Sequence, residues 1–277
     1  MKKIIIAVFT LLCLAIVIQV SFFFGLFGKF NLVCLPKYVH TEEYDFDNVS
    51  FVNPKDVSLL SIGDYNGFLK MYYSLKYFEN LNDFDFEFYP KKIKNVDFLR
   101  NLTELEVLWI AGNSRDWSGI SECKKVNSLH IRDSNFSELD YLKDMHNIRY
   151  LDIRTSSELI YSDEADFSSA TVIDIKAPLI DISDIRTAVN VTGMGLDAKK
   201  ISGFDTLKNM KSLESLRLLE ADIDEGSLAI VLESDSIKRL SFLRCNFSIS
   251  EEQVNEALKG FYERKVEVTL DECVFSE

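Results

Sequence analysis

The chain contains three histidines, His40, His130 and His146, which are its first candidates for chemistry. None has the spacing from a cysteine or a second histidine that a zinc site requires. A hydrolase needs a histidine between a carboxylate and a nucleophile. The sequence offers Asp152 as a carboxylate for His130 but assigns no serine or cysteine nucleophile. No P-loop, dinucleotide-binding glycine motif or G-x-S-x-G elbow occurs. We therefore expect no enzyme, cofactor or bound metal, with a hydrolase as the alternative.

Acidic residues dominate the charge of the chain. In the stretch "NDFDFEFYP", Asp83, Asp85 and Glu87 alternate with phenylalanines. These carboxylates could bind calcium, but the glycine turn and spaced oxygen ligands of a calcium loop are missing, so a solvated acidic face is preferred. The formal net charge is −13, and because residues 1–30 contain three lysines and no acid, the remainder carries −16. A body this acidic repels phosphate backbones, so nucleic acid is not an expected partner.

A long uncharged segment, "IIIAVFTLLCLAIVIQVSFFFGLFG", runs from Ile4 to Gly28. As a helix it would extend roughly 37 Å, enough to cross a hydrocarbon core of about 30 Å. The apolar run is longer than a signal-peptide core and no A-x-A site follows it, so we expect an uncleaved signal anchor. A cleaved signal and a secreted protein are the alternative. Two lysines before the segment and one after it favour a cytoplasmic N-terminus and an extracytoplasmic body.

The elements that would position a site follow from an internal repeat. The stretch "NIRYLDIRTS" places Leu151 and Ile153 on one side of a strand and Tyr150, Asp152 and Arg154 on the other. Its pattern, apolar at positions 1, 4 and 6, recurs every 21 or 22 residues, starting at Leu105, Val126, Ile148, Ala170, Val191 and Leu213. Weaker copies start at Val57, Leu81, Ile237 and Lys265. We therefore predict ten strands from these ten motifs.

The return segments between the strands carry a second set of apolar residues. One such segment has Phe136, Leu139, Leu142 and Met145, which align with Ile201, Phe204, Leu207 and Met210 of another. One strand and one return cannot bury their apolar faces alone, but stacked copies share a continuous core. The last return, "SEEQVNEALKGFYER", predicts a helix capped by Ser250, with Val254, Leu258 and Phe261 on one face.

From Val57 to Cys273 the chain resembles the leucine-rich repeat family, in its short-repeat form of about 22 residues. The resemblance implies an α/β solenoid, an arc whose concave side is a parallel sheet of about ten strands. The residue that closes each motif departs from the family, because only Asn113 is the expected asparagine, with Cys245 and Cys273 as the accepted substitute. These two thiols would lie about 5 Å apart on adjacent strands, as a disulfide or, preferably, as two buried thiols. Cys123 should also be buried.

Positions 3, 5 and 7 of each motif should point away from the core, because side chains alternate along a strand. Tryptophan, tyrosine and arginine on such a surface are typical of binding hot spots. The residues that we predict to bind a partner are Trp109, His130, Arg132, Tyr150, Asp152, Arg154, Asp174 and Lys176. The alternative is that the acidic and basic ladders neutralise each other without a ligand. On the same face, Gly193 and Gly195 predict a flat patch.

These patterns divide the chain into a signal anchor (1–30), a linker with an N-terminal cap (31–56) and a leucine-rich repeat domain (57–277). We predict a non-enzymatic, single-pass membrane protein whose extracytoplasmic repeats bind a protein or cell-surface ligand through the concave face. A preformed face loses little conformational entropy on binding, so a few anchor residues suffice. The alternative is a structural or inhibitory envelope scaffold that acts through its convex side or its ends.

Overall fold

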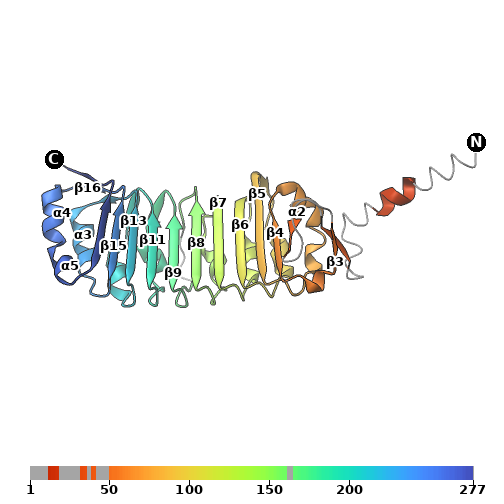
Figure 1. Cartoon of the computed structure of the whole chain (residues 1–277), viewed down its shortest axis with the longest axis horizontal. Coiled ribbons are helices and arrows are strands. Elements are labelled where there is room, and N and C mark those ends of the chain that lie inside the picture. The colour runs from red at the N-terminus through yellow and green to blue at the C-terminus, as the bar shows by residue number, and fades with distance from the viewer. Residues whose placement is uncertain (1–11, 19–31, 36–38, 42–49, 161–164, 277) are drawn as a thin grey trace, which may run out of the picture.

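The computed structural model describes residues 12–18, 32–35, 39–41, 50–160 and 165–276 (Figure 1). Residues 12–18 are helical. Within the described ranges, no helix combines the length and the apolar character that crossing a membrane requires. Most of the predicted span from Ile4 to Gly28 lies outside the described residues, so the signal anchor stays a prediction.

One large sheet runs along the molecule, with its strands side by side (Figure 1). Ten strands form its parallel part, in chain order from one end to the other: β4 (Leu59–Ile62), β5 (Asp83–Ile93), β6 (Val107–Ser114), β7 (Ser128–Ser134), β8 (Tyr150–Thr155), β9 (Val172–Lys176), β11 (Gly193–Asp197), β13 (Ser215–Leu219), β15 (Arg239–Leu243) and β17 (Glu267–Asp271). Each strand begins in one of the ten predicted motifs, and β5 and β6 extend beyond theirs. The chain therefore folds as a leucine-rich repeat solenoid, and the strand count is confirmed.

The register between strands is the one that the repeat predicts. Asp85, Trp109, His130, Asp152 and Asp174, the fifth residues of successive motifs, are paired strand to strand. The same ladder continues through Gly195, Arg217, Ser241 and Thr269. Side chains at equivalent positions therefore line up across the sheet, so residues about 22 apart in sequence become neighbours.

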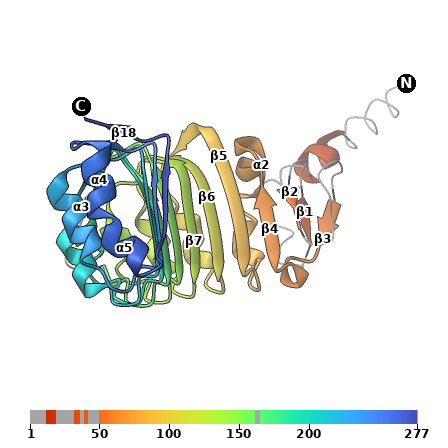
Figure 2. The same cartoon turned by 60° about the vertical axis from the view of Figure 1, so that its left-hand side comes forward.

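The returns lie on one side of the sheet, as Figure 2 shows for the helices near the C-terminus. Most are short 3₁₀ turns: η2 (Pro54–Asp56), η3 (Leu75–Tyr77), η4 (Asp97–Asn101), η5 (Ser118–Glu122), η6 (Leu139–Leu142), η7 (Ile182–Ile185) and η8 (Phe204–Asn209). The α-helices are α2 (Tyr65–Met71), α3 (Glu225–Leu232), α4 (Glu251–Ala257) and α5 (Lys259–Glu263). Short parallel pairs join some returns, namely β10 (Leu179–Asp181) with β12 (Lys200–Ser202), and β16 (Asn246–Phe247) with β14 (Asp222–Ile223) and β18 (Val274–Phe275).

The core lies between the sheet and the returns. Leu151 and Ile153 of β8 are fully buried, as are Phe136 and Met145 of the return before it. The predicted last helix is confirmed, because the Ser250 hydroxyl accepts from the Gln253 amide and the Gln253 side chain accepts from the Ser250 amide. Its predicted apolar face is buried at Val254, Leu258 and Phe261. Both sets of apolar residues thus form one continuous core, as the repeat requires.

Two of the three cysteines in the repeats, Cys123 and Cys245, are core residues. Cys123 is buried, and burial raises the pKa of its thiol to about 12. Cys245 and Cys273 are free thiols. Each thiol donates to a backbone carbonyl of the preceding repeat, that of Leu218 at 3.4 Å and that of Phe242 at 3.3 Å respectively. The preferred prediction of two buried thiols is confirmed in part, because both cysteines are free thiols but only Cys245 is buried and Cys273 is partly exposed.

The segment before the first repeat adds strands to the N-terminal end. β1 (Val33–Leu35) pairs with β3 (Ser50–Val52), and β2 (Val39–His40) pairs antiparallel with β4 at the edge of the main sheet. The apolar residues Val33, Leu35, Val39 and Val52 are buried. A covered edge strand has no free row of backbone groups to pair with another chain. The boundaries predicted at residues 30 and 56 stay predictions.

Candidate functional site

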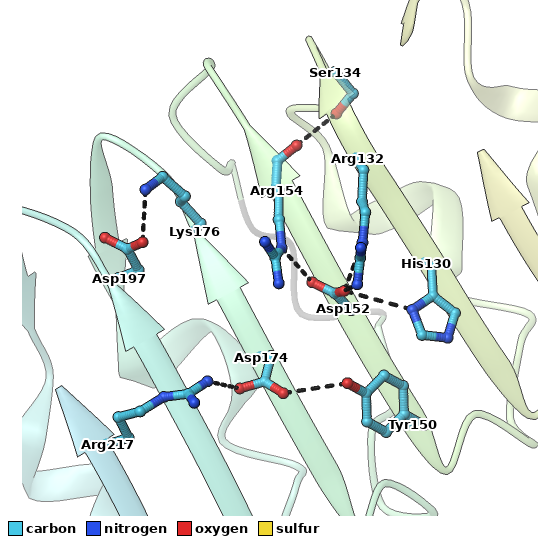
Figure 3. Close-up of polar contacts among 10 residues, drawn as sticks. All are labelled: His130, Arg132, Ser134, Tyr150, Asp152, Arg154, Asp174, Lys176, Asp197 and Arg217. Carbon is cyan, nitrogen blue, oxygen red and sulfur yellow. Dashed lines mark hydrogen bonds and ion pairs between the residues drawn. The ribbon is translucent and has the colours of Figure 1, made fainter. Parts of the chain in front are cut away.

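The eight predicted binding residues lie on the side of the main sheet that faces away from the returns, which we call the open face. They come from four adjacent strands, β6 to β9 (Figure 3 shows all but Trp109). Alternation along the strands places them there, since their neighbours in sequence, such as Leu108, Ile131 and Ile153, are buried in the core. They form two groups, one centred on Asp152 and one on Asp174.

Asp152 is the centre of the first group, and it is only 1% exposed. Its carboxylate accepts from Arg132 Nε at 2.9 Å and Nη2 at 2.5 Å, from Arg154 Nε at 3.2 Å and from His130 Nδ1 at 3.5 Å (Figure 3). Burial alone would raise the pKa of Asp152, but the hydrogen bonds from His130 and Arg132 and the charges of Arg132 and Arg154 lower it to about 2. The buried carboxylate is therefore charged at neutral pH and fully compensated.

A β-bulge helps to place Arg132 over this carboxylate. The pairing of β7 with β8 shifts between Ile131 and Ser134, and Asp133 takes a positive φ of 46° at that point. A bulge bends the strand and changes the direction of a side chain. Arg132 reaches diagonally to Asp152 on the next strand, and its guanidinium also lies 4.5 Å from the centroid of the Trp109 ring on the preceding strand.

Three rings stack across the same strands. The His130 ring lies 3.5 Å from that of Trp109, centroid to centroid, with 9° between their planes. On its other side the Tyr150 ring is 4.9 Å away. His130 is 6% exposed, whereas Trp109 and Tyr150 are half-buried and still reach solvent. We call Trp109, His130, Tyr150 and Arg132 the aromatic stack, a rigid apolar surface edged by a cation.

The second group bridges strands over a glycine. Arg217 Nη2 donates to Asp174 at 3.0 Å although β11 lies between their strands, and the Tyr150 hydroxyl donates to the same carboxylate at 3.4 Å (Figure 3). A Cβ on Gly195 would lie 2.1 Å from Asp174 Oδ1 and 2.9 Å from Arg217 Nη2. In the predicted flat patch, the lack of a side chain at Gly195 therefore leaves room for this ion pair to cross β11. Lys176 pairs with Asp197 at 2.7 Å, and both residues line a cavity of about 250 Å³.

The structure adds a serine that sequence reasoning missed. Ser128 Oγ lies 3.1 Å from His130 Nε2, so Ser128, His130 and Asp152 are connected as in a serine hydrolase. Residues two apart on one strand share a face, and this spacing was the signal that could have found the serine. The carboxylate, however, already accepts from two arginines, and the cavity on this face is lined by Asp152 and Arg154 but not by Ser128 or His130. Ser128 therefore fits a structural partner that fixes the ring of His130.

The eight predicted binding residues differ in how far they reach the surface. His130 and Asp152 are buried, so they act through their neighbours, whereas Trp109, Arg132, Tyr150, Arg154, Asp174 and Lys176 are at least partly exposed. Every cation among them has a carboxylate partner on the sheet, Asp152 for both arginines and Asp197 for the lysine. The alternative prediction, that the ladders neutralise each other, thus describes their charges correctly and leaves the aromatic stack as the distinctive feature.

Comparisons with known proteins give only distant likenesses. No family model matches the chain, and no curated protein matches it. Among solved structures it is similar to internalin C2 of Listeria monocytogenes, with 11% identity, 83% of this chain and 87% of that one covered, and a TM-score of 0.45. It is also similar to InlJ of the same organism (18%, 73% and 42%, 0.45) and to a plant peptide hormone receptor, RGFR1, in complex with RGF2 (12%, 73% and 41%, 0.40). The fold assignment rests on the strand register, and these likenesses add nothing about function.

Proposed function

We propose that the protein is a non-enzymatic, membrane-anchored leucine-rich repeat protein of the short-repeat type that binds a protein outside the cytoplasm through its open face. The apolar segment Ile4–Gly28 would supply the anchor, and the lysines around it the orientation. The observation that carries the proposal is the aromatic stack. Two half-exposed rings, Trp109 and Tyr150, flank a buried histidine, with an arginine over one of them.

Composition and rigidity together support a binding role. Tryptophan, tyrosine and arginine are the residue types most enriched among those that dominate binding energy. Here their positions are set by sheet register, by stacking and by the buried Asp152 carboxylate, so a partner would meet a surface that is already ordered. Little conformational entropy is then lost on association. The side chains of Arg132, within the stack, and Arg154, next to it, stay 34% and 51% exposed. A partner surface that combines apolar groups with acidic ones would therefore complement both the rings and these cations.

A capture experiment tests the proposal. The full-length chain, in mild detergent, is used to capture partners from envelope extracts of the source organism, beside a Trp109→Ala/Tyr150→Ala/Arg154→Ala variant. A matched control, Lys238→Ala/Arg239→Ala/Leu243→Ala, changes two residues of β15 and the residue before it, four strands along the sheet from β8. We expect a partner that is retained by the wild type and the control and lost by the stack variant. Equal capture by all three folded chains would refute a role for the stack.

The second candidate is a scaffold that acts through its return side or its ends. It is favoured by the pairing of Arg132, Arg154 and Lys176 with carboxylates of the same sheet, which leaves these charges satisfied without a ligand. This function predicts that the stack variant retains every partner of the wild type. The same capture experiment therefore distinguishes the two.

A further inference from the structure

A second cavity, of about 690 Å³, lies at the other end of the first strands, away from the aromatic stack. It is formed where α2 packs against β5, beyond the point at which the pairing of β5 with β6 shifts between Glu87 and Lys92 (Figure 2 shows α2 beside the end of β5). We call it the rim pocket. Its lining shares no residue with the open-face groups.

The rim pocket combines aromatic and cationic side chains. Tyr65, Tyr72 and Tyr73 line it together with the buried Phe68 and Ile93. Lys92, Lys94 and Arg115 supply three positive charges, and none of the ten lining residues is acidic. The chain as a whole has a net charge of −13, so the local charge of this pocket is opposite in sign to that of the protein.

The ion pairing of these three cations differs from that of the cations among the eight open-face residues. Among the residues that the structure describes, no ion pair joins Lys92, Lys94 or Arg115 to an acid, whereas Arg132, Arg154 and Lys176 on the open face are each paired with a carboxylate. Their backbones are nevertheless fixed. Lys92 is paired with Asn113 in the sheet, and the Arg115 amide donates to the Ile93 carbonyl at 3.1 Å. The pocket therefore presents unneutralised cations, carried on an ordered backbone, beside aromatic rings.

We propose that the rim pocket binds a short acidic peptide segment that carries an aromatic side chain. Its volume is in the range of sites that enclose a few side chains or a small ligand. The carboxylates would pair with Lys92, Lys94 and Arg115, while the aromatic ring would pack on the tyrosines and on Leu69, which is 40% exposed. A long polyanion or an anionic membrane would face the acidic body around the pocket and be repelled, and this repulsion favours a short segment.

A peptide titration tests this proposal on the full-length chain in non-ionic detergent. The probe is a fluorescein-labelled eight-residue peptide with four acids and two tyrosines, and its uncharged counterpart has asparagine and glutamine in place of the acids. The readout is fluorescence anisotropy at low and moderate ionic strength. We expect saturable binding of the acidic peptide only, weakened by salt because the ion pairs are exposed.

Variants locate the binding. Lys92→Glu/Lys94→Glu/Arg115→Glu should weaken binding by about tenfold or more, as three exposed ion pairs contribute together. Leu69→Glu should weaken it through repulsion at the apolar wall. The matched control, Lys199→Glu/Lys200→Glu/Lys211→Glu, makes the same change in net charge at exposed lysines of distant repeats and should leave the affinity within about twofold.

Three results would overturn the proposal. One is failure of the folded wild type to bind the acidic peptide. Another is equal weakening by the rim variant and its control, which would show a general charge effect. The third is displacement of the peptide by millimolar inorganic phosphate that itself binds in a rim-dependent manner, which would assign the pocket to a small anion.

Discussion

Two regions of the molecule concentrate positive charge, and they treat it in opposite ways. On the open face, Arg132 and Arg154 converge on one buried carboxylate, Asp152. In the rim pocket, Lys92, Lys94 and Arg115 have no acidic partner among the described residues. The number of cations on a surface therefore does not say how many of them are available to pair with a ligand. On the open face, the arginines and the carboxylate neutralise each other and hold the surrounding side chains in place. In the rim pocket, the cations are available to pair with a ligand.

Removal of the central carboxylate should have the largest effect on stability. Asp152→Asn leaves the geometry nearly unchanged but removes the charge that holds Arg132, Arg154 and His130. Breaking a buried, charge-assisted network is costly, and because both arginines are partly exposed we expect a loss of about 2–3 kcal/mol in the free energy of unfolding. Urea denaturation measures it. Asp174→Asn, at a more exposed carboxylate, is the control and should cost less than about 1 kcal/mol.

The same carboxylate predicts a pH dependence. Folding lowers the pKa of Asp152 from an ordinary value of 3.8 to about 2. The stabilisation is therefore fully present above about pH 4 and is lost as the pH falls through about 2. The difference in unfolding free energy between wild type and Asp152→Asn should shrink between these values. A difference that stayed constant down to pH 2 would contradict the assignment.

The ion pair that crosses Gly195 predicts a smaller effect. In Gly195→Ala the new methyl group would displace Asp174 and Arg217, and we expect a loss of about 1 kcal/mol. Gly193 is the matched control on the same strand, since its Cβ would meet only Val172 at 3.9 Å, and alanine there should be neutral or slightly stabilising. In an Asp174→Ala background the cost of Gly195→Ala should disappear. Thermal unfolding of the four variants tests this, and equal costs at both glycines would refute it.

The smallest effect is expected at Ser128. Ser128→Ala removes one hydrogen bond to His130, at a cost of no more than about 1 kcal/mol, and leaves the ring stacked between Trp109 and Tyr150. A fluorophosphonate probe, which labels activated serines, should not react with the wild type at this residue. Peptide mapping of the treated protein supplies the measurement. Covalent labelling of Ser128 that is lost in His130→Ala would revive the hydrolase alternative.

Much of the fold follows from periodicity. The ten strands, the ladder from Asp85 to Thr269 and the cap at Ser250 were all predictable, because strand alternation and a near-constant repeat leave one register that buries every apolar residue. The same register brought His130 and Asp152 together. The strand register depends only on how the backbone repeats, so the spacing of the motifs is enough to predict which residues become neighbours across the sheet.

What spacing could not predict depends on side-chain direction and on interruptions of the repeat. The burial of Asp152 depends on the direction of the Arg132 side chain, which reaches across to the next strand beside the bulge at Asp133. The bridge over Gly195 joins strands that are not neighbours. The rim pocket is built from α2 and from the extension of β5, segments outside the repeating motif, so its lining had no register from which to be predicted.

Site-specific cross-linking can show whether the aromatic stack contacts a protein partner. A photoreactive phenylalanine derivative is placed at Trp109 in the full-length chain, with Lys211 on a distant, exposed return as the control position. Irradiation of intact source cells, followed by mass spectrometry, identifies the adducts. We predict a specific protein adduct at position 109 that is absent at 211 and is reduced by Arg154→Ala. The same adducts from both positions, or adducts from 211 alone, would contradict the account.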